Sequence, residues 1–257
     1  MTDWPYPYWI AHRGAGRLTP ENTLAAFRLG AQHGFRAFEC DVKLSADGVP
    51  FLLHDTTLER TTNGHGTAGE QAWAELAHLD AGSWHGRHYA GEPLPTLDAI
   101  ARYVRANGHL LNIEIKPTPG TEELTGRAVA SAASRLWPAG EAPPLLSSFR
   151  PESLAGALAA APQLPRALLL DTLWDDWDSV AQQLGCVAVV ANYTLYSAAL
   201  VKQLRAAGMR ALAYTVNDPA TAQWLAGLGL DGLITDAVDQ FAPGIGPQAS
   251  STPRTRE

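Results

Sequence analysis

Short apolar runs, many of them rich in β-branched residues, alternate along this chain with Ala- and Leu-rich segments of helical spacing. This alternation favours a parallel sheet, because each helix returns the chain to the same edge. Eight such units in roughly 250 residues are what a (β/α)8 barrel requires, so the predicted fold is a TIM barrel. An open doubly wound sheet is the alternative, although it normally has fewer strands at this length. The predicted strands are residues 8–12, 37–42, 110–116, 144–149, 166–170, 187–191, 210–216 and 232–236.

The alternation is interrupted once, after the second predicted strand. Residues 55–97 are rich in Gly, His, Thr and Trp, a composition that suits no single regular helix. We expect an inserted cap subdomain over the barrel at this point. Residues 243–257 have the Pro, Gly and Ser content of a flexible tail. The sequence therefore predicts one domain over residues 1–242, with the insertion inside it.

The acidic balance of the chain disfavours polyanionic partners. Lys and Arg total 19 against 26 Asp and Glu, which gives a formal charge of −7, so we expect binding neither to nucleic acid nor to an anionic membrane. Cys40 and Cys186 are far apart and indicate no disulfide framework or zinc site. The first residues lack a signal-peptide pattern, and no apolar run has the length of a membrane span. These features predict a cytoplasmic protein without stable membrane association.

Two neighbouring predicted strands carry acidic side chains on one face. Glu39 and Asp41 are two residues apart, as are Glu114 and Lys116, and side chains in a strand alternate between faces. Carboxylates crowded into one interior repel each other and lose solvation unless a cation compensates. Ligands that are all oxygen favour Mg²⁺ or Ca²⁺ over zinc, which makes the three acids candidate ligands of one divalent cation. Ordinary salt bridges are the alternative. The candidate basic partners are Arg13, Lys43 and Lys116.

The first predicted strand ends in groups that suit phosphate chemistry. His12 and Arg13 lie at its carboxyl end, where TIM barrels have their active sites, and Gly14 and Gly16 would let the backbone approach a ligand closely. The guanidinium fork of arginine suits a phosphate, and histidine exchanges a proton near neutral pH. His54, just before the insertion, is a second such histidine.

A helix is expected directly after this loop, over residues 20–33. Thr19 is a candidate N-cap, and Pro20 would occupy the first helical position. Glu21 and Asn22 would then lie in the first turn.

Together these residues form an apparatus suited to cleaving a phosphodiester. Arg13, Lys116 and the cation would neutralise the phosphoryl oxygens, and the two histidines would act as base and acid. No serine or cysteine nucleophile is needed for this chemistry.

The chain resembles the glycerophosphodiester phosphodiesterase family in its bacterial, cytosolic form. The resemblance extends over about residues 8–240, nearly the whole chain, and the joint pattern is specific although each piece alone is not. The matching segments, in chain order, are AHRG, PENT, ECDVKLSADGVPFLLHD, HDTTLERTTNG, NIEIKP, YTVND and GLDGLITD.

The resemblance implies a TIM barrel with a small insertion after the second strand. It also implies hydrolysis of glycerophosphodiesters, such as glycerophosphocholine or glycerophosphoethanolamine, to sn-glycerol 3-phosphate and an alcohol. His12 and His54 would be the acid–base pair, and Arg13 and Lys116 would contact the phosphate. One divalent cation, Mg²⁺ or Ca²⁺, is implied as cofactor. Its ligands would be Glu39, Asp41 and Glu114.

Two aromatic residues complete the pocket that the resemblance implies. Phe149 matches a pocket aromatic of the family, with simple barrel packing as the alternative. Tyr214 stands where many members have tryptophan, so its ring would still face the pocket, and its hydroxyl would alter the preference for the alcohol.

The sequence leaves alternatives open for both the mechanism and the function. The glycerol 2-hydroxyl could attack the phosphorus, with His12 as base and His54 as acid, to form a cyclic phosphate; direct attack by water is the other route. A barrel phosphodiesterase of the phospholipase C or D type, acting on lipids, is a second function to consider, with aromatic residues of the insertion such as Trp84 as contacts. A non-catalytic barrel that binds phosphorylated metabolites is a third.

Overall fold

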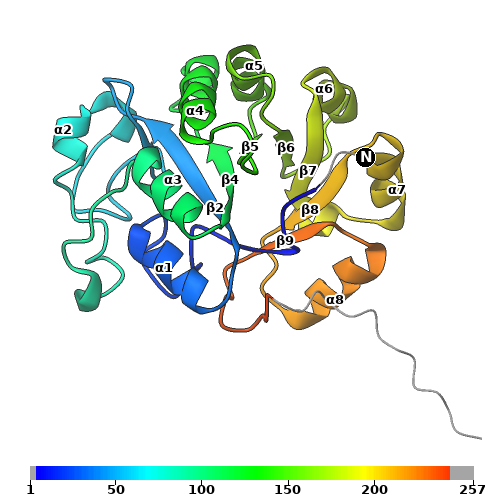
Figure 1. Ribbon diagram of the computed structural model, residues 1–257, viewed down its shortest axis with the longest axis horizontal. Helices are drawn as coiled ribbons and strands as arrows, with labels where there is room; N and C mark the ends of the chain where they lie inside the picture. Colours follow the sequence, from blue (N-terminus) through cyan, green and yellow to red (C-terminus); the bar gives the residue numbers. More distant parts are fainter. Residues whose placement is uncertain (1–3, 244–257) are drawn as a thin grey trace, which may run out of the picture.

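A closed parallel barrel forms the centre of the protein (Figure 1). The computed structural model describes residues 4–243. Within them eight parallel strands are hydrogen-bonded in a ring, which the pairing of Ala11 with Phe38 closes, and a short ninth strand adds to it in antiparallel orientation. The predicted TIM barrel is thus confirmed and the open sheet is excluded. The ring consists of β1 (Trp9–Ala11), β2 (Ala37–Leu44), β4 (Leu110–Ile115), β5 (Leu145–Ser148), β6 (Arg166–Leu170), β7 (Cys186–Asn192), β8 (Arg210–Tyr214) and β9 (Gly232–Thr235), and the addition is β3 (Pro50–Leu52).

Helices surround the barrel and cover the outward faces of its strands (Figure 1). Several begin at a residue whose side chain accepts a hydrogen bond from the first turn, as Thr96 and Ser197 do. Among the described helices, none combines the length and the apolar character that a membrane crossing requires. The surrounding helices are α1 (Leu24–Gln32), α3 (Leu97–Ala106), α4 (Glu122–Leu136), α5 (Pro151–Ala160), α6 (Trp177–Gln183), α7 (Ala198–Ala206) and α8 (Pro219–Leu228).

The start of α1 differs from the prediction. Thr23 rather than Thr19 is the N-cap, and the helix begins at Leu24. Asn22 lies in the preceding loop with a left-handed φ of 58°, because its side-chain amide donates to Asp41 Oδ2 at 2.8 Å and its Oδ1 accepts from the backbone N–H of Asp41 at 3.1 Å. The predicted helix start was wrong because these bonds to β2 outweigh the local preference of a Thr-Pro pair.

The segment between β3 and α3 folds into short elements around a small apolar core. They are the 3₁₀ helices η1 (Ala68–Glu70) and η2 (Arg87–Tyr89) and one short helix, α2 (Trp73–Leu76), so the segment contains no long regular helix, as expected. The boundary predicted at residue 242 stays a prediction, because the tail lies outside the described residues apart from residue 243. The core of the segment consists of Phe51, Leu53, Leu58, Ala68, Leu76, Ala81 and Leu94.

The barrel interior is apolar toward the amino ends of the strands and polar toward the carboxyl ends. On β2, Ala37 belongs to the apolar interior, and the next inward positions are Glu39, Asp41 and Lys43, all of them buried. The polar and titratable side chains of β2 that face the interior therefore lie toward one end of the barrel. The apolar interior is formed by Tyr6, Ile10, Ala37, Leu145, Ala167, Leu169, Ala188, Val190, Leu212 and Ile234.

The contact between α4 and α5 depends on a glycine. A β-carbon at Gly126 would overlap the carbonyl oxygen of Ser153. We expect Gly126→Ala to lower the free energy of unfolding by about 1–3 kcal/mol, because the two helices must separate. Gly227→Ala, at an exposed site on α8 with nothing within 4 Å, should raise it by about 0.5–1 kcal/mol. Urea titration measures the free energy of unfolding of both variants. A change of the same sign in the two would contradict the close packing of α4 and α5 at Gly126.

Candidate active site

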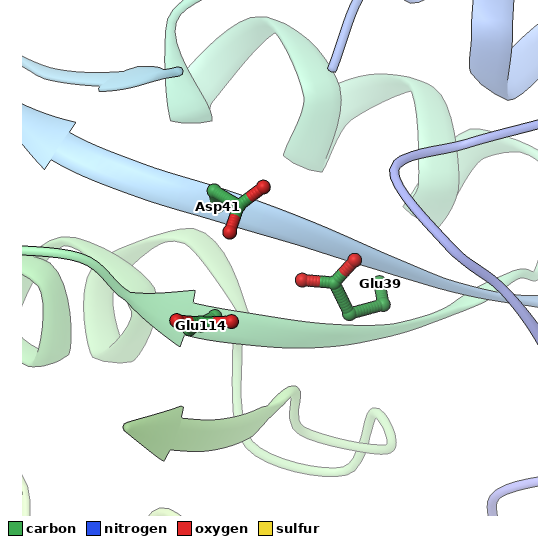
Figure 2. Close-up of side chains that lie close together, drawn as sticks. All are labelled: Glu39, Asp41 and Glu114. Atoms are coloured by element: carbon green, nitrogen blue, oxygen red, sulfur yellow. The ribbon is translucent and has the colours of Figure 1, made fainter. Parts of the chain in front are cut away.

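Three carboxylates from two neighbouring strands meet near the carboxyl end of the barrel (Figure 2). Glu39 and Asp41 come from β2 and Glu114 from β4, where Asp41 and Glu114 are paired in register. One oxygen atom from each lies within 4.8 Å of the other two, and no residue of the three is more than 9% exposed. The shared face predicted from the alternation of side chains is confirmed.

Two basic side chains offset part of this negative charge. Lys116 Nζ lies 2.6 Å from Glu114 Oε1 and 3.5 Å from Asp41 Oδ1. Arg13 Nε lies 3.3 Å from Asp41 Oδ2, and the backbone N–H of Arg13 donates to Glu39 Oε2 at 3.0 Å. Salt bridges, the alternative considered from the sequence, therefore account for part of the charge balance of the cluster, through Arg13 and Lys116.

The remaining oxygens fit a divalent cation. Glu39 Oε1 and Asp41 Oδ1 are buried and have no hydrogen-bond partner among the described residues. A buried carboxylate oxygen without a donor is destabilising, and Mg²⁺ and Ca²⁺ bind such oxygens. Because every ligand in the cluster is a carboxylate, the residues could hold a cation of this kind.

Burial and repulsion shift the pKa values of the three acids in different directions. Burial, together with Asp41, raises the pKa of Glu39 to about 8 and also raises the pKa of Glu114. Burial disfavours the ionised form of Asp41 as well, but Arg13 and Lys116 hold its pKa below the ordinary value. The cluster thus has more acidic groups than its basic neighbours neutralise.

His12 is held at the end of β1 by an acid from β9. His12 Nδ1 lies 2.6 Å from Asp236 Oδ1, and Asn217 fixes that carboxylate by donating to Asp236 Oδ2 at 3.2 Å. Burial lowers the pKa of His12, but the hydrogen bond to Asp236 and the charge of Glu39 outweigh it and raise the pKa. His12 Nε2 faces the acidic cluster, 3.7 Å from Glu39 Oε2.

His54 is held in a corresponding way by its neighbour in the chain. His54 Nδ1 lies 2.7 Å from Asp55 Oδ1. Arg60 donates to Asp55 and also, at 2.9 Å, to Glu21 Oε2, so it links the inserted segment to the loop before α1. Burial lowers the pKa of His54, and the charge of Asp41 only partly offsets this effect.

The loop after β1 requires glycine because it packs closely against other parts of the protein. Gly14 and Gly16 have φ values of 96° and 57°. A β-carbon at Gly16 would overlap the backbone of Asp236, and one at Gly14 would lie against Ala26. The two glycines thus let the loop pack against the protein's own backbone, which brings His12 and Asp236 together, and the close approach to a ligand stays a prediction.

The predicted residues gather around one cavity of about 170 Å³. The rings of Phe149 and Tyr214 meet edge to face with centroids 5.7 Å apart, and Lys116 Nζ lies 5.6 Å from the Phe149 centroid. The Tyr214 hydroxyl donates to the carbonyl oxygen of Leu170 at 3.1 Å, so it is held by the barrel wall. The cavity is lined by His12, Arg13, Glu39, His54, Glu114, Lys116, Phe149 and Tyr214, and Asp41 lies beside Glu114.

Sequence reasoning missed the residues that hold the two histidines. Asp236 and Asn217 are in the segments GLITD and YTVND, which contributed to the resemblance without being given a role. Asp236 lies two residues after Ile234 of the barrel interior, so the alternation of side chains could have placed it at the barrel mouth. Asp55 and Arg60 gave no such signal, because their contacts depend on how the inserted segment folds.

A closed (β/α)8 barrel with titratable side chains gathered at the carboxyl ends of its strands defines a TIM-barrel enzyme. The chain belongs to the glycerophosphoryl diester phosphodiesterase family, whose profile matches residues 12–240. The resemblance drawn from the motifs is therefore confirmed. A glycerophosphodiester phosphodiesterase of Caldanaerobacter subterraneus subsp. tengcongensis is 33% identical over 232 residues, which cover 88% of this chain and 93% of the relative.

Solved structures agree with this assignment. A phosphodiesterase of Oleispira antarctica, in complex with the product sn-glycerol-3-phosphate, matches with a TM-score of 0.86 and 37% identity, covering 91% of this chain and 95% of its own. A glycerophosphodiester phosphodiesterase of Agrobacterium tumefaciens matches with a TM-score of 0.78 and 30% identity, covering 92% and 99%. Both relatives share the fold over nearly their full length.

The contact between His12 and Asp236 should be essential to turnover. We expect Asp236→Asn to lower kcat by about 10–100-fold or more, because the amide no longer fixes the ring with its proton on Nδ1. Asp231→Asn is the matched control, since Asp231 precedes β9 and pairs with Arg210 at the other end of the barrel. Phosphodiester turnover measures both variants, and equal rates for the two would contradict the assigned role of Asp236.

Proposed function

We propose that this protein hydrolyses glycerophosphodiesters to sn-glycerol 3-phosphate and an alcohol, with His12 and His54 as the acid–base pair. The observation that carries the proposal is that the two histidines line one cavity together with an acidic cluster, and that a carboxylate holds Nδ1 of each ring. The product bound to the Oleispira antarctica relative supports the glycerol 3-phosphate side of the reaction.

The hydrogen bonds of the two histidines suit proton transfer at Nε2. A neutral ring whose Nδ1–H donates to a carboxylate carries its acceptor lone pair on Nε2, and the same carboxylate stabilises the ring once it is protonated. In His12 this lone pair accepts a hydrogen bond from Arg13 Nε at 3.2 Å, so the nucleophile would take the place of that contact. Asp236 would do this for His12, and Asp55 for His54. One ring would accept the proton of the nucleophile, and the other would protonate the oxygen of the departing alcohol.

Glu39, Asp41 and Glu114 would hold one divalent cation, Mg²⁺ or Ca²⁺. The bound cation would supply positive charge beside the phosphoryl oxygens. Arg13 and Lys116, which lie against the same carboxylates, would contact the phosphoryl group and orient it between the two histidines.

The nucleophile would be the glycerol 2-hydroxyl, and the first product a cyclic phosphate. In this order His12 takes the proton of the hydroxyl at Nε2, and His54 gives a proton to the leaving alcohol. Water then opens the cyclic phosphate while the histidines exchange roles. Direct attack by water on the diester is the alternative route.

One observation favours the lipid alternative as a second candidate function. Trp84 of the inserted segment is 40% exposed and lines a cavity together with His12. An acyl chain on the glycerol could lie against this ring, in which case a lysophospholipid would also be a substrate. The cytoplasmic location stays a prediction from the sequence.

Activity should require the cation, the histidines of the acid–base pair and the carboxylates of the cation site. We expect metal-stripped protein to release no glycerol 3-phosphate from glycerophosphocholine until Mg²⁺ or Ca²⁺ is added. His12→Ala and Glu39→Ala should each lower the rate by at least about 100-fold, because one removes the acid–base group and the other a ligand. A coupled assay for glycerol 3-phosphate measures the rate of the metal-stripped protein and of the two variants.

Matched controls are available on the surface. His33→Ala and Glu70→Ala change exposed residues of the same types and should leave the rate within about twofold. Release that needs no metal, or that survives both active-site substitutions, would contradict the proposed function.

The two routes differ in their need for the glycerol 2-hydroxyl. We expect a diester that lacks this hydroxyl to bind but not to release its alcohol, because it has no internal nucleophile. Release of the alcohol can be followed by chromatography, with the intact diester as the reference. Cleavage of the deoxy compound at a rate similar to the reference would show that water attacks directly.

A further inference from the structure

The catalytic cavity continues into a second and larger lobe. This lobe has a volume of about 530 Å³, against about 170 Å³ for the cavity at the acidic cluster. His54, Glu114, Lys116 and Phe149 line both, so the two spaces adjoin. In the proposed function His54 protonates the departing alcohol, and the lobe beyond it is therefore where the headgroup of that alcohol would lie.

Lys43 lines this lobe from β2. It follows Glu39 and Asp41 on the inward face of the strand and is only 1% exposed. Its Nζ donates one hydrogen bond, at 3.3 Å, to the backbone carbonyl oxygen of Lys116. Lys43 forms no salt bridge with a carboxylate in the described part of the chain, whereas Lys116 Nζ lies 2.6 Å from Glu114. The salt-bridge alternative drawn from the sequence thus does not apply to Lys43.

A buried lysine with so few partners needs an explanation. An ammonium group has three hydrogens to donate, and burying it without compensating acceptors is destabilising. A substrate atom that accepts a hydrogen bond in the lobe would satisfy it.

The other charged residues of the lobe are either paired with each other, as Lys116 and Glu114 are, or nearer to solvent. Arg150 and Asp171 are exposed and Glu122 is half-buried, and Arg150 offsets Glu122 in part. Water screens exposed charges far more than buried ones, and among the described residues that line the lobe Lys43 is the buried charge without a salt-bridge partner. Asp171 and Trp174, on the outer wall, would instead favour a cationic headgroup, and this is the competing expectation.

We infer that Lys43 is a specificity-determining residue that selects headgroups carrying hydroxyl or carboxylate oxygens over headgroups carrying a quaternary ammonium. This inference rests on the proposed function and specifies its substrate class. A hydroxyl of a glycerol headgroup accepts a hydrogen bond from Lys43 Nζ. A trimethylammonium group accepts none and is repelled by the buried charge.

The test compares two diesters that differ only in the headgroup, glycerophosphoglycerol and glycerophosphocholine. We expect the wild-type protein to have a kcat/KM at least about tenfold higher for glycerophosphoglycerol, because its headgroup satisfies a buried donor that the choline headgroup leaves unpaired. Lys43→Met should bring the two values within about threefold, through loss on the glycerol substrate. Lys43→Arg should keep the preference, since it keeps a charged donor.

Controls distinguish a role of Lys43 in specificity from a role in folding, and they distinguish failure of this inference from failure of the proposed function. Lys202→Met, an exposed site on α7, should change neither kcat/KM. Thermal unfolding checks that Lys43→Met is folded; if it is not, Lys43→Gln takes its place, with the same fall in preference expected. A wild-type preference for glycerophosphocholine, or an equal loss on both substrates in the variants, would overturn the role of Lys43. Absence of glycerol 3-phosphate from both substrates in the wild-type protein would overturn the proposed function itself, and this inference with it.

Discussion

The crowding of three buried carboxylates at one end of the barrel is the constraint on which the rest of the site depends. Glu39, Asp41 and Glu114 cannot all be ionised at low energy unless positive charge lies among them. Lys116 and Arg13 supply part of it and leave two buried oxygens without a hydrogen bond among the described residues. A site built in this way favours a divalent cation, and with it an anionic substrate. The acidic net charge of the chain is no obstacle to such a substrate, because the local balance of charge at the barrel mouth decides binding.

Closure of the barrel brings one of the proposed acid–base residues and its carboxylate partner together. His12 and Asp236 are 224 residues apart in the chain, and they meet because β1 and β9 are neighbours in the ring. His54 is held differently, by Asp55 and by Arg60 of the inserted segment, so the insertion supports the site. The two histidines therefore depend on different parts of the fold. The same construction leaves a lobe beside His54 that a buried lysine lines.

The alternation of apolar runs with helical segments was enough to predict the barrel, and the alternation of side chains within strands predicted the acidic cluster. The predicted strands agree with the observed ones within two residues at each end, and Glu39, Asp41 and Glu114 meet as expected. Other features could not be read in this way. The start of α1 depends on hydrogen bonds between Asn22 and β2, and the antiparallel strand β3 forms only where the chain turns back on β2. Contacts of this kind follow from tertiary structure, so local propensity gives the wrong helix start and no signal for the strand.

Direct measurement of cation binding tests the central claim, that the three carboxylates form one divalent site. Isothermal titration calorimetry of metal-stripped protein with Mg²⁺ and with Ca²⁺ gives the stoichiometry and affinity without reference to turnover. The account predicts one site per chain for at least one of the two ions, and its loss in Glu39→Gln and Glu114→Gln, which remove a ligand charge while keeping the size of the side chain. Full retention of binding in both variants, or no binding of either ion by the wild-type protein, would contradict it.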